Sequence, residues 1–204
     1  MTTKTLGEAA RHLAARDETL ARILATYGAP PMWRRRAGFE TLVHIILEQQ
    51  VSLKSAKAML VRLQSAIHPF MPERFVELGD THLRSLGVTR QKSAYLLHLS
   101  ENILNGELSL TRLSRMPDDA VRMKLTQIKG IGSWSADVYL LMAMRRADIW
   151  PAGDLALAVA AKDLFRLQQK PSPEELERIA EKWRPYRAVA ARMLWQHYLG
   201  KKTI

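Results

Sequence analysis

Apolar positions recur along most of the chain with the spacing of an α-helix. In residues 39–47, 56–63 and 95–103 the apolar side chains fall three or four residues apart, which places them on one face of a helix. The single strand-like alternation covers residues 108–110 and is too short to form a sheet. The pattern therefore predicts an all-α fold.

Residues with special backbone preferences mark the ends of the predicted helices. Asn105 and Gly106 follow the apolar segment 95–103. Asn and Gly are common just after the last residue of a helix, so they mark its end. Ser172, Pro173 and Glu175 combine an N-cap, a proline in the first turn and a capping-box glutamate. Further helices are expected at residues 135–146, at residues 155–167 and from near residue 185 to residue 200.

The length of 204 residues fits one domain, or two small lobes that share a core. No internal repeat, low-complexity segment or obvious linker interrupts it. Two prolines at 30 and 31, followed by the arginines at 34–36, mark the passage from an N-terminal helical segment into the main bundle. We therefore expect a single domain, 1–204, with an N-terminal segment (1–36), central helices (37–146) and C-terminal helices (147–204).

Positive charge is the main feature of the composition. Lys and Arg number 31 against 20 Asp and Glu, a formal net charge of +11. This excess favours a polyanionic partner, most simply a nucleic acid, although basic composition alone does not show binding. The following residues are candidates for a phosphate-facing surface or, equally, for a solvated face: Arg34, Arg35, Arg36, Arg90, Lys92, Arg145 and Arg146.

Two absences narrow the class of protein. The chain has no cysteine, which excludes disulfides, zinc–thiolate sites and cysteine-ligated iron–sulfur clusters. No apolar run approaches the roughly 20 residues that a membrane-spanning helix needs, and the N-terminus lacks the apolar core of a signal peptide. We expect a soluble protein of the cytoplasm, associated with the nucleoid if the source is prokaryotic.

A glycine pair interrupts the helical pattern at residues 128–133. Gly130 and Gly132 flank Ile131 and permit a tight reversal that other residues resist. Amides left bare at the start of the following helix would form a phosphate site, and Lys129 adds a cation. The alternative is an ordinary helix–helix turn, since glycine is common in turns.

A second interruption ends at Asp154, immediately before the apolar segment 155–167. Its position is that of an N-cap. A capping carboxylate and a catalytic one do not exclude each other, because a helix N-terminus stabilises negative charge. Gly153, one residue earlier, would let a ligand approach the backbone closely.

The two interruptions together resemble the helix-hairpin-helix DNA glycosylase superfamily, in which a glycine hairpin and one helix precede a Pro-x-x-Asp motif. Asp154 follows Gly132 by 22 residues, in keeping with that pattern. The segments Gln49–Ser52 and Trp183–Arg187, together with Trp134 and Trp195, resemble the alkylation-repair branch, the 3-methyladenine DNA glycosylase II type. The resemblance covers roughly residues 33–200 and shows no extra N-terminal β domain.

The resemblance implies a compact helical bundle of two lobes with an active-site cleft between them. It implies that the hairpin binds DNA phosphates through Ile128, Lys129, Gly130, Ile131, Gly132 and Ser133, and that Gln50 is the wedge filling the gap left by a flipped nucleotide. Gln50 is otherwise a polar residue at a helix end. No cofactor is required, but the backbone carbonyls of Thr126, Ile128 and Ile131 would hold a structural Na⁺ or K⁺.

For the chemistry, the resemblance makes Asp154 the catalytic carboxylate. An N3- or N7-alkylated purine is already cationic, so the remaining task is to stabilise the developing oxocarbenium ion and orient water. Trp195, Trp134 and Trp150 would line the base pocket, where an aromatic face attracts a cation. Trp134 and Trp195 are alternatively core residues, as is Trp183, because tryptophan is mostly buried.

The expected activity is therefore that of a monofunctional DNA glycosylase. Superfamily members that also cleave the backbone carry a lysine nucleophile two residues after the second hairpin glycine, and Trp134 stands at that position. Its partner would be duplex DNA containing alkylated bases, and it would act as a monomer. The rival functions are a non-catalytic helix-hairpin-helix protein that binds distorted DNA and a basic helical interaction protein unrelated to DNA.

Overall fold

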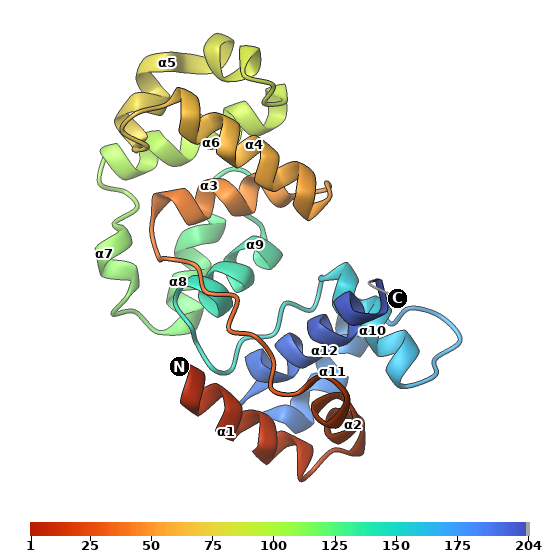
Figure 1. The fold of residues 1–204 in the computed structure, drawn as a ribbon. Helices are drawn as coiled ribbons and strands as arrows, with labels where there is room; N and C mark the ends of the chain where they lie inside the picture. Colours follow the sequence, from red (N-terminus) through yellow and green to blue (C-terminus); the bar gives the residue numbers. More distant parts are fainter. Residues whose placement is uncertain (203–204) are drawn as a thin grey trace. The chain divides into compact units, whose positions relative to one another are not determined.

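The computed structural model describes residues 1–202, and within them it contains helices and no strands (Figure 1). The all-α prediction is confirmed. The α-helices are α1 (Thr3–Ala14), α2 (Glu18–Tyr27), α3 (Phe39–Glu48), α4 (Leu53–Ala66), α5 (Pro72–Ser85), α6 (Arg90–Leu104), α7 (Leu110–Leu113), α8 (Asp118–Thr126), α9 (Ser133–Val138), α10 (Leu155–Leu164), α11 (Pro173–Ala180) and α12 (Arg187–Lys202). A π-helical segment, Tyr139–Ala143, continues α9, and a 3₁₀ segment, Glu181–Trp183, continues α11.

The chain forms two compact units. The first unit contains residues 1–34 and 140 onward, and the second contains residues 35–139. The chain therefore changes unit between Arg34 and Arg35 and again between Tyr139 and Leu140. The segments predicted from the sequence end nearby, at residues 36 and 146.

In the first unit α12 is the central helix. Every residue from 188 to 195 is buried, as expected of a helix surrounded by others rather than one with a solvent face. It packs against α1, α2 and α10. One polar side chain, that of Arg192, lies within this run and is fully buried.

In the second unit α3 has the corresponding place. Its residues 41–48 are almost all buried, and it packs against α4, α6 and α9. The helix pair α8 and α9 encloses the glycine turn and is a contact pair of its own. The turn is therefore attached to the core of this unit through α9 and α3.

The predicted caps at Asp154 and Ser172 begin helices in the structure, and backbone features explain the helix ends that differ from the prediction. Ser172 forms the expected capping box with Glu175. The helix expected to reach residue 146 stops being α-helical at Val138, widens into the π-helical segment and ends at Ala143. α10 ends at Leu164 rather than residue 167, because Arg166 adopts a left-handed φ of 53°.

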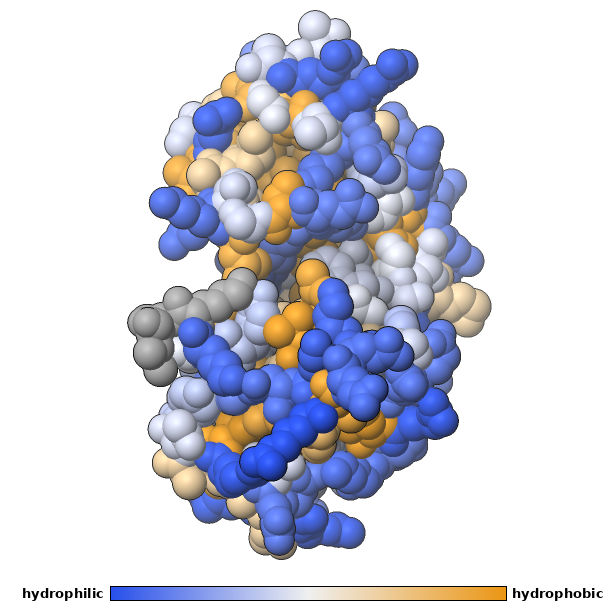
Figure 2. Space-filling view, turned by 90° about the vertical axis from the view of Figure 1, so that its right-hand side faces the viewer, coloured by the Kyte–Doolittle hydropathy of each residue, from blue (hydrophilic) through white to orange (hydrophobic). Residues whose placement is uncertain are grey.

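Hydrophilic residues dominate the face drawn in Figure 2, and smaller hydrophobic areas lie between them. Large apolar side chains are exposed at several single positions, including Leu53, Met123 and Leu155. None of the helices in residues 1–202 combines the length and hydrophobicity needed to cross a bilayer.

Candidate active site

Asp154 is the N-cap of α10 and is almost completely buried, with 8% of its surface exposed. Its Oδ1 accepts the backbone N–H of Leu157 at 2.9 Å, which is the capping bond. The same oxygen accepts the indole N–H of Trp195 at 3.0 Å. The cap predicted from sequence is confirmed, and a second donor from another helix fixes the plane of the carboxylate.

Trp195 lies on α12 and is 7% exposed. Its ring also makes an edge contact with Trp33, with 6.4 Å between ring centroids and 70° between ring planes. Trp33 is half-buried and has a φ of 43°, a left-handed conformation that is unusual for a bulky side chain. Such strain persists where surrounding contacts impose it and is frequent at functional sites.

Arg192 supplies one of those surrounding contacts. Its guanidinium donates to the backbone carbonyl of Met32, the residue before Trp33, and to that of Leu141 at 3.0 Å. Burial lowers the pKa of Arg192 to about 10, so the side chain is still a cation at neutral pH. Sequence reasoning missed both Trp33 and Arg192. The available signal was an arginine within the apolar run 188–195.

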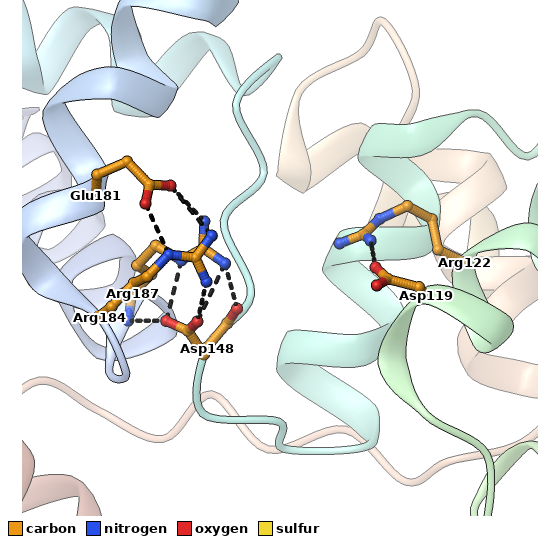
Figure 3. Close-up of polar contacts among 6 residues, drawn as sticks. All are labelled: Asp119, Arg122, Asp148, Glu181, Arg184 and Arg187. Carbon is orange, nitrogen blue, oxygen red and sulfur yellow. Dashed lines mark hydrogen bonds and ion pairs between the residues drawn. The ribbon is translucent and has the colours of Figure 1, made fainter.

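Asp154 ends a loop, residues 147–154, that α12 holds at both ends. At the first end, Asp148 pairs with Arg187 at 3.0 Å and with Arg184 at 2.7 Å (Figure 3). The backbone N–H of Arg187 also donates to Asp148, at 3.2 Å. At the other end, Asp154 is bonded to Trp195. Arg184 and Arg187, two residues of the segment 183–187, therefore help to position the loop that carries Asp154.

The glycine turn belongs to the second unit and connects α8 to α9. Ile128 and Ile131 are each 3% exposed and anchor it in the core, and the N–H of Ile131 donates to the carbonyl of Ile128 at 2.9 Å. Lys129, Gly132 and Ser133 are exposed. The turn thus presents one side to the core and the other to solvent.

The structure explains the glycine at position 130 and the glycine at position 132 differently. Gly130 has a φ of 89°, and a Cβ there would lie 2.1–2.6 Å from ring atoms of Tyr95, so no other residue fits. At Gly132 φ is −86° and a Cβ would meet nothing within 4 Å. No side chain of the described chain caps the helix that starts after Gly132. The internal packing therefore explains Gly130 but leaves Gly132 unexplained.

Arg122 ties α8 and α9 together beneath the turn. Its guanidinium contacts Asp137 of α9 at 2.8 Å and Asp119 of α8 at 2.6 Å, the latter drawn in Figure 3. Burial acts to lower the pKa of Arg122, but the two carboxylates outweigh it and raise that pKa. The pair of helices around the turn is therefore joined by a charged contact as well as by apolar packing.

Side chains from two other elements hold the turn. The N–H of Lys129 donates to Nδ1 of His98 on α6 at 3.1 Å. The side-chain amide of Gln49 donates to the carbonyl of Gly130 at 2.7 Å and to the hydroxyl of Ser135 at 3.0 Å. Gln50, the next residue, is exposed and has a left-handed φ of 56°.

The other tryptophans occupy different surroundings. Trp134 is half-buried in α9 of the second unit, whereas Trp195 belongs to the first. Trp150 is 4% exposed and packs against Trp183, with 5.4 Å between ring centroids. Trp183 is a core residue whose indole N–H donates to Asp17 at 2.9 Å. The structure therefore gives Trp150 a core partner, and the base-pocket role remains a prediction.

Two of the seven basic residues that are candidates for a phosphate-facing surface make contacts within the second unit. Arg35 makes a two-pronged contact with the buried Glu48, at 2.6 and 2.8 Å. Lys92 donates to the carbonyl of Leu47 at 2.7 Å, and burial lowers its pKa. Arg34, Arg36 and Arg90 are exposed, and Arg145 and Arg146 are half-buried.

The sequence profile of the family described as "HhH-GPD superfamily base excision DNA repair protein" matches residues 43–185, well over half of the chain. The chain belongs to this superfamily. Its HhH-GPD region contains the glycine turn, the loop 147–154 and Asp154, so the match spans elements of both units.

Three proteins illustrate the similarity. A solved structure of Schizosaccharomyces pombe 3-methyladenine DNA glycosylase (Mag1) in complex with abasic DNA is 27% identical, with a TM-score of 0.85 over 93% of this chain and 95% of that one. A DNA-3-methyladenine glycosidase from Bacillus halodurans is 30% identical, with a TM-score of 0.79 over 93% and 88%. The putative DNA-3-methyladenine glycosylase YfjP of Bacillus subtilis is 28% identical over 87% of this chain, which spans only 65% of that relative.

Proposed function

We propose that the protein is a DNA glycosylase of base excision repair that hydrolyses the N-glycosidic bond of alkylated purines in duplex DNA and leaves an abasic site. The observation that carries the proposal is the buried carboxylate of Asp154, held at a helix N-terminus by the indole of Trp195. The similarity to 3-methyladenine DNA glycosylases, one of them bound to abasic DNA, supports it.

In this proposal Asp154 stabilises the cation that develops on the sugar as the base leaves. The N–H groups of Leu157 and Trp195 donate to its Oδ1, which helps to set the orientation of the carboxylate before substrate arrives. Preorganised charge of this kind, removed from water, is the usual source of large transition-state stabilisation. A base alkylated at N3 or N7 is itself cationic, so it departs without a general acid.

The glycine turn is the proposed contact with DNA phosphates. Gly132 is exposed, carries no side chain and precedes a helix start without a side-chain cap. Backbone amides in that setting suit a phosphate oxygen. Gln50 is the proposed wedge, since the enzyme must extrude the nucleotide and fill the gap.

We also propose that the enzyme is monofunctional and acts as a monomer. Trp134 occupies the position at which the lyase members of the superfamily have their lysine, so no amine is available there to form a Schiff base. Borohydride treatment during reaction should therefore trap no covalent protein–DNA adduct. Recovery of such an adduct would overturn this part of the proposal.

The turn also suits a monovalent cation as a structural component. Its proposed ligands are the backbone carbonyls of Thr126, Ile128 and Ile131, an oxygen-only donor set appropriate to Na⁺ or K⁺. The Ile128 carbonyl already accepts the N–H of Ile131 and keeps a second lone pair. No group of three or more acidic or histidine side chains in residues 1–202 forms a candidate metal site.

The test is release of bases from randomly methylated duplex DNA, identified by chromatography. Asp154→Asn keeps an oxygen for the cap and for Trp195, so the fold should survive while excision is lost and binding to abasic DNA continues. Asp163→Asn is the matched control, because Asp163 also lies on α10 and contacts α12, through His197 and Lys201, but is exposed. This variant should stay active. Undiminished excision by Asp154→Asn would favour a different catalytic group, and binding without excision by the wild type would favour the non-catalytic rival.

A further inference from the structure

In the second unit, two basic side chains bind the C-terminal end of α3. The carbonyl of Leu47 accepts the ammonium group of Lys92. The carboxylate of Glu48, 6% exposed, is bound by both terminal nitrogens of Arg35. Two successive residues, one through its backbone and one through its side chain, are thus fixed by cations from other parts of the unit.

Gln49 continues this series and links it to the glycine turn. Its amide nitrogen donates two hydrogen bonds, one to the carbonyl of Gly130 and one to the hydroxyl of Ser135. The first acceptor lies in the turn and the second in the helix after it. A single side chain therefore connects the end of α3 to both parts of the hairpin.

Gln50 follows directly, and its backbone is strained. It has a left-handed φ of 56° and an exposed side chain. On its other side, the hydroxyl of Ser52 caps α4 by accepting the N–H of Ser55 at 3.1 Å. Strained residues keep their conformation only when neighbours over-determine it, and here Gln49 and the α4 cap are those neighbours.

We propose that Gln49 is a positioning residue that couples the phosphate-binding turn to Gln50, so that the two contact DNA as one rigid body. The inference rests on the proposed function, in which the turn holds phosphates and Gln50 enters the duplex. The glycine turn would then determine the position of Gln50 relative to the DNA. Gln49 itself touches neither the base nor the sugar.

This coupling matters only for duplex DNA. In a duplex the wedge must replace a base within a stack, and an error in its position exposes a gap. In a single strand no opposite strand or closed stack has to be filled. Loss of Gln49 should therefore lower excision from duplex DNA while largely sparing excision from the same strand alone.

The experiment compares single-turnover release of 7-methylguanine from a duplex with release from the isolated strand. For Gln49→Leu we expect the duplex rate to fall at least about fivefold, the factor corresponding to one net hydrogen bond, and the single-strand rate to stay within about twofold. Gln64→Leu is the matched control, because Gln64 also donates a side-chain bond, to Glu40 at 2.9 Å in the same unit. Its duplex-to-single-strand ratio should equal that of the wild type.

Two further variants secure the interpretation. Gln49→Asn keeps an amide but shortens the side chain by one methylene, so it replaces Gln49→Leu if that variant does not fold. In a Gln50→Ala background, removing Gln49 should change the ratio less than in the wild type, since the two residues act together. The proposal would be overturned if the Gln49 variants left the duplex-to-single-strand rate ratio unchanged, or if they lowered the excision rate equally on both substrates. Full additivity of the Gln49 and Gln50→Ala effects would overturn it as well. A wild type that releases base from neither substrate would instead refute the proposed function.

Discussion

The indole N–H of Trp195 and the backbone N–H of Leu157 share one acceptor, Oδ1 of Asp154. Helix α12 therefore takes part in capping α10, and the same bonds orient the carboxylate. If Asp154 is the catalytic carboxylate that we propose, a structural role and a chemical role are combined in one oxygen atom.

Trp195→Phe should separate these roles. The variant keeps an aromatic ring but removes one donor from a buried carboxylate, which costs about 1.5 kcal/mol and should lower the single-turnover excision rate roughly tenfold. The matched control is Trp183→Phe, because the Trp183 indole also donates to a carboxylate, that of Asp17. The control should lose similar stability in denaturant unfolding and retain the excision rate. Equal rates for the two variants would contradict the orienting role.

The glycine turn predicts opposite outcomes for two Gly→Ala substitutions. Gly130→Ala meets the Tyr95 ring and an unfavourable φ, so it should cost about 2–4 kcal/mol in the free energy of unfolding. Gly132→Ala meets neither obstacle and should leave stability almost unchanged, but its methyl group would lie at the proposed phosphate contact. Urea unfolding and binding to abasic duplex DNA measure the two effects. Unchanged DNA affinity in Gly132→Ala would remove the phosphate role.

Removing the anchor at the start of the 147–154 loop should weaken both stability and activity. Asp148→Ala leaves Arg187, which is 8% exposed, without its main partner. Because the Asp148 side chain is itself 25% exposed, we expect the free energy of unfolding to fall by about 2 kcal/mol. Asp119→Ala breaks the other carboxylate contact of Figure 3, but that side chain is 94% exposed, so the cost should stay below about 0.5 kcal/mol. Melting temperatures and single-turnover rates test both. Equal losses of stability and of excision rate in the two variants would argue against the role of Asp148 as an anchor of the loop.

The second unit should lose stability as the pH falls through the range in which histidine titrates. Burial lowers the pKa of His44, the nearby Arg35 and Lys57 act in the same direction, and Glu48 and Glu40 oppose them. The unfolded chain therefore takes up the proton first, at about pH 6.5, and folding stability decreases from there toward the lower folded pKa. His44→Gln should flatten the unfolding free energy between pH 7.5 and 5 relative to the wild type. An identical slope in both proteins would contradict this assignment.

The parts of the fold that local sequence encodes were predictable. Periodic apolar faces located α3, α4 and α6, and the capping preference of aspartate placed Asp154 at the start of α10. The π-helical segment after α9 was not predictable, because residues 138–144 are all apolar and carry no periodicity that could reveal a wider turn. Its early end moved the predicted boundary from residue 146 to Ala143.

Long-range pairings account for what the sequence could not reveal at the site. The bond from Arg192 to Met32 joins residues 160 positions apart, and nothing near either residue records the other. The same holds for Trp33, which gains its place beside Trp195 only through the fold. Gln49 and Gln50 look alike in sequence, yet one side chain points into the hairpin and the other is exposed.

Contacts made by three residues of α12 limit its tolerance to insertions and deletions. Arg187 holds Asp148, Arg192 holds Met32 and Leu141, and Trp195 holds Asp154. One residue inserted between Arg187 and Trp195 would turn the two ends of the helix by about 100° relative to each other and would break at least one of these contacts whatever its composition. The number of residues between Arg187 and Trp195 is therefore constrained by the fold as strictly as the side chains that make these contacts.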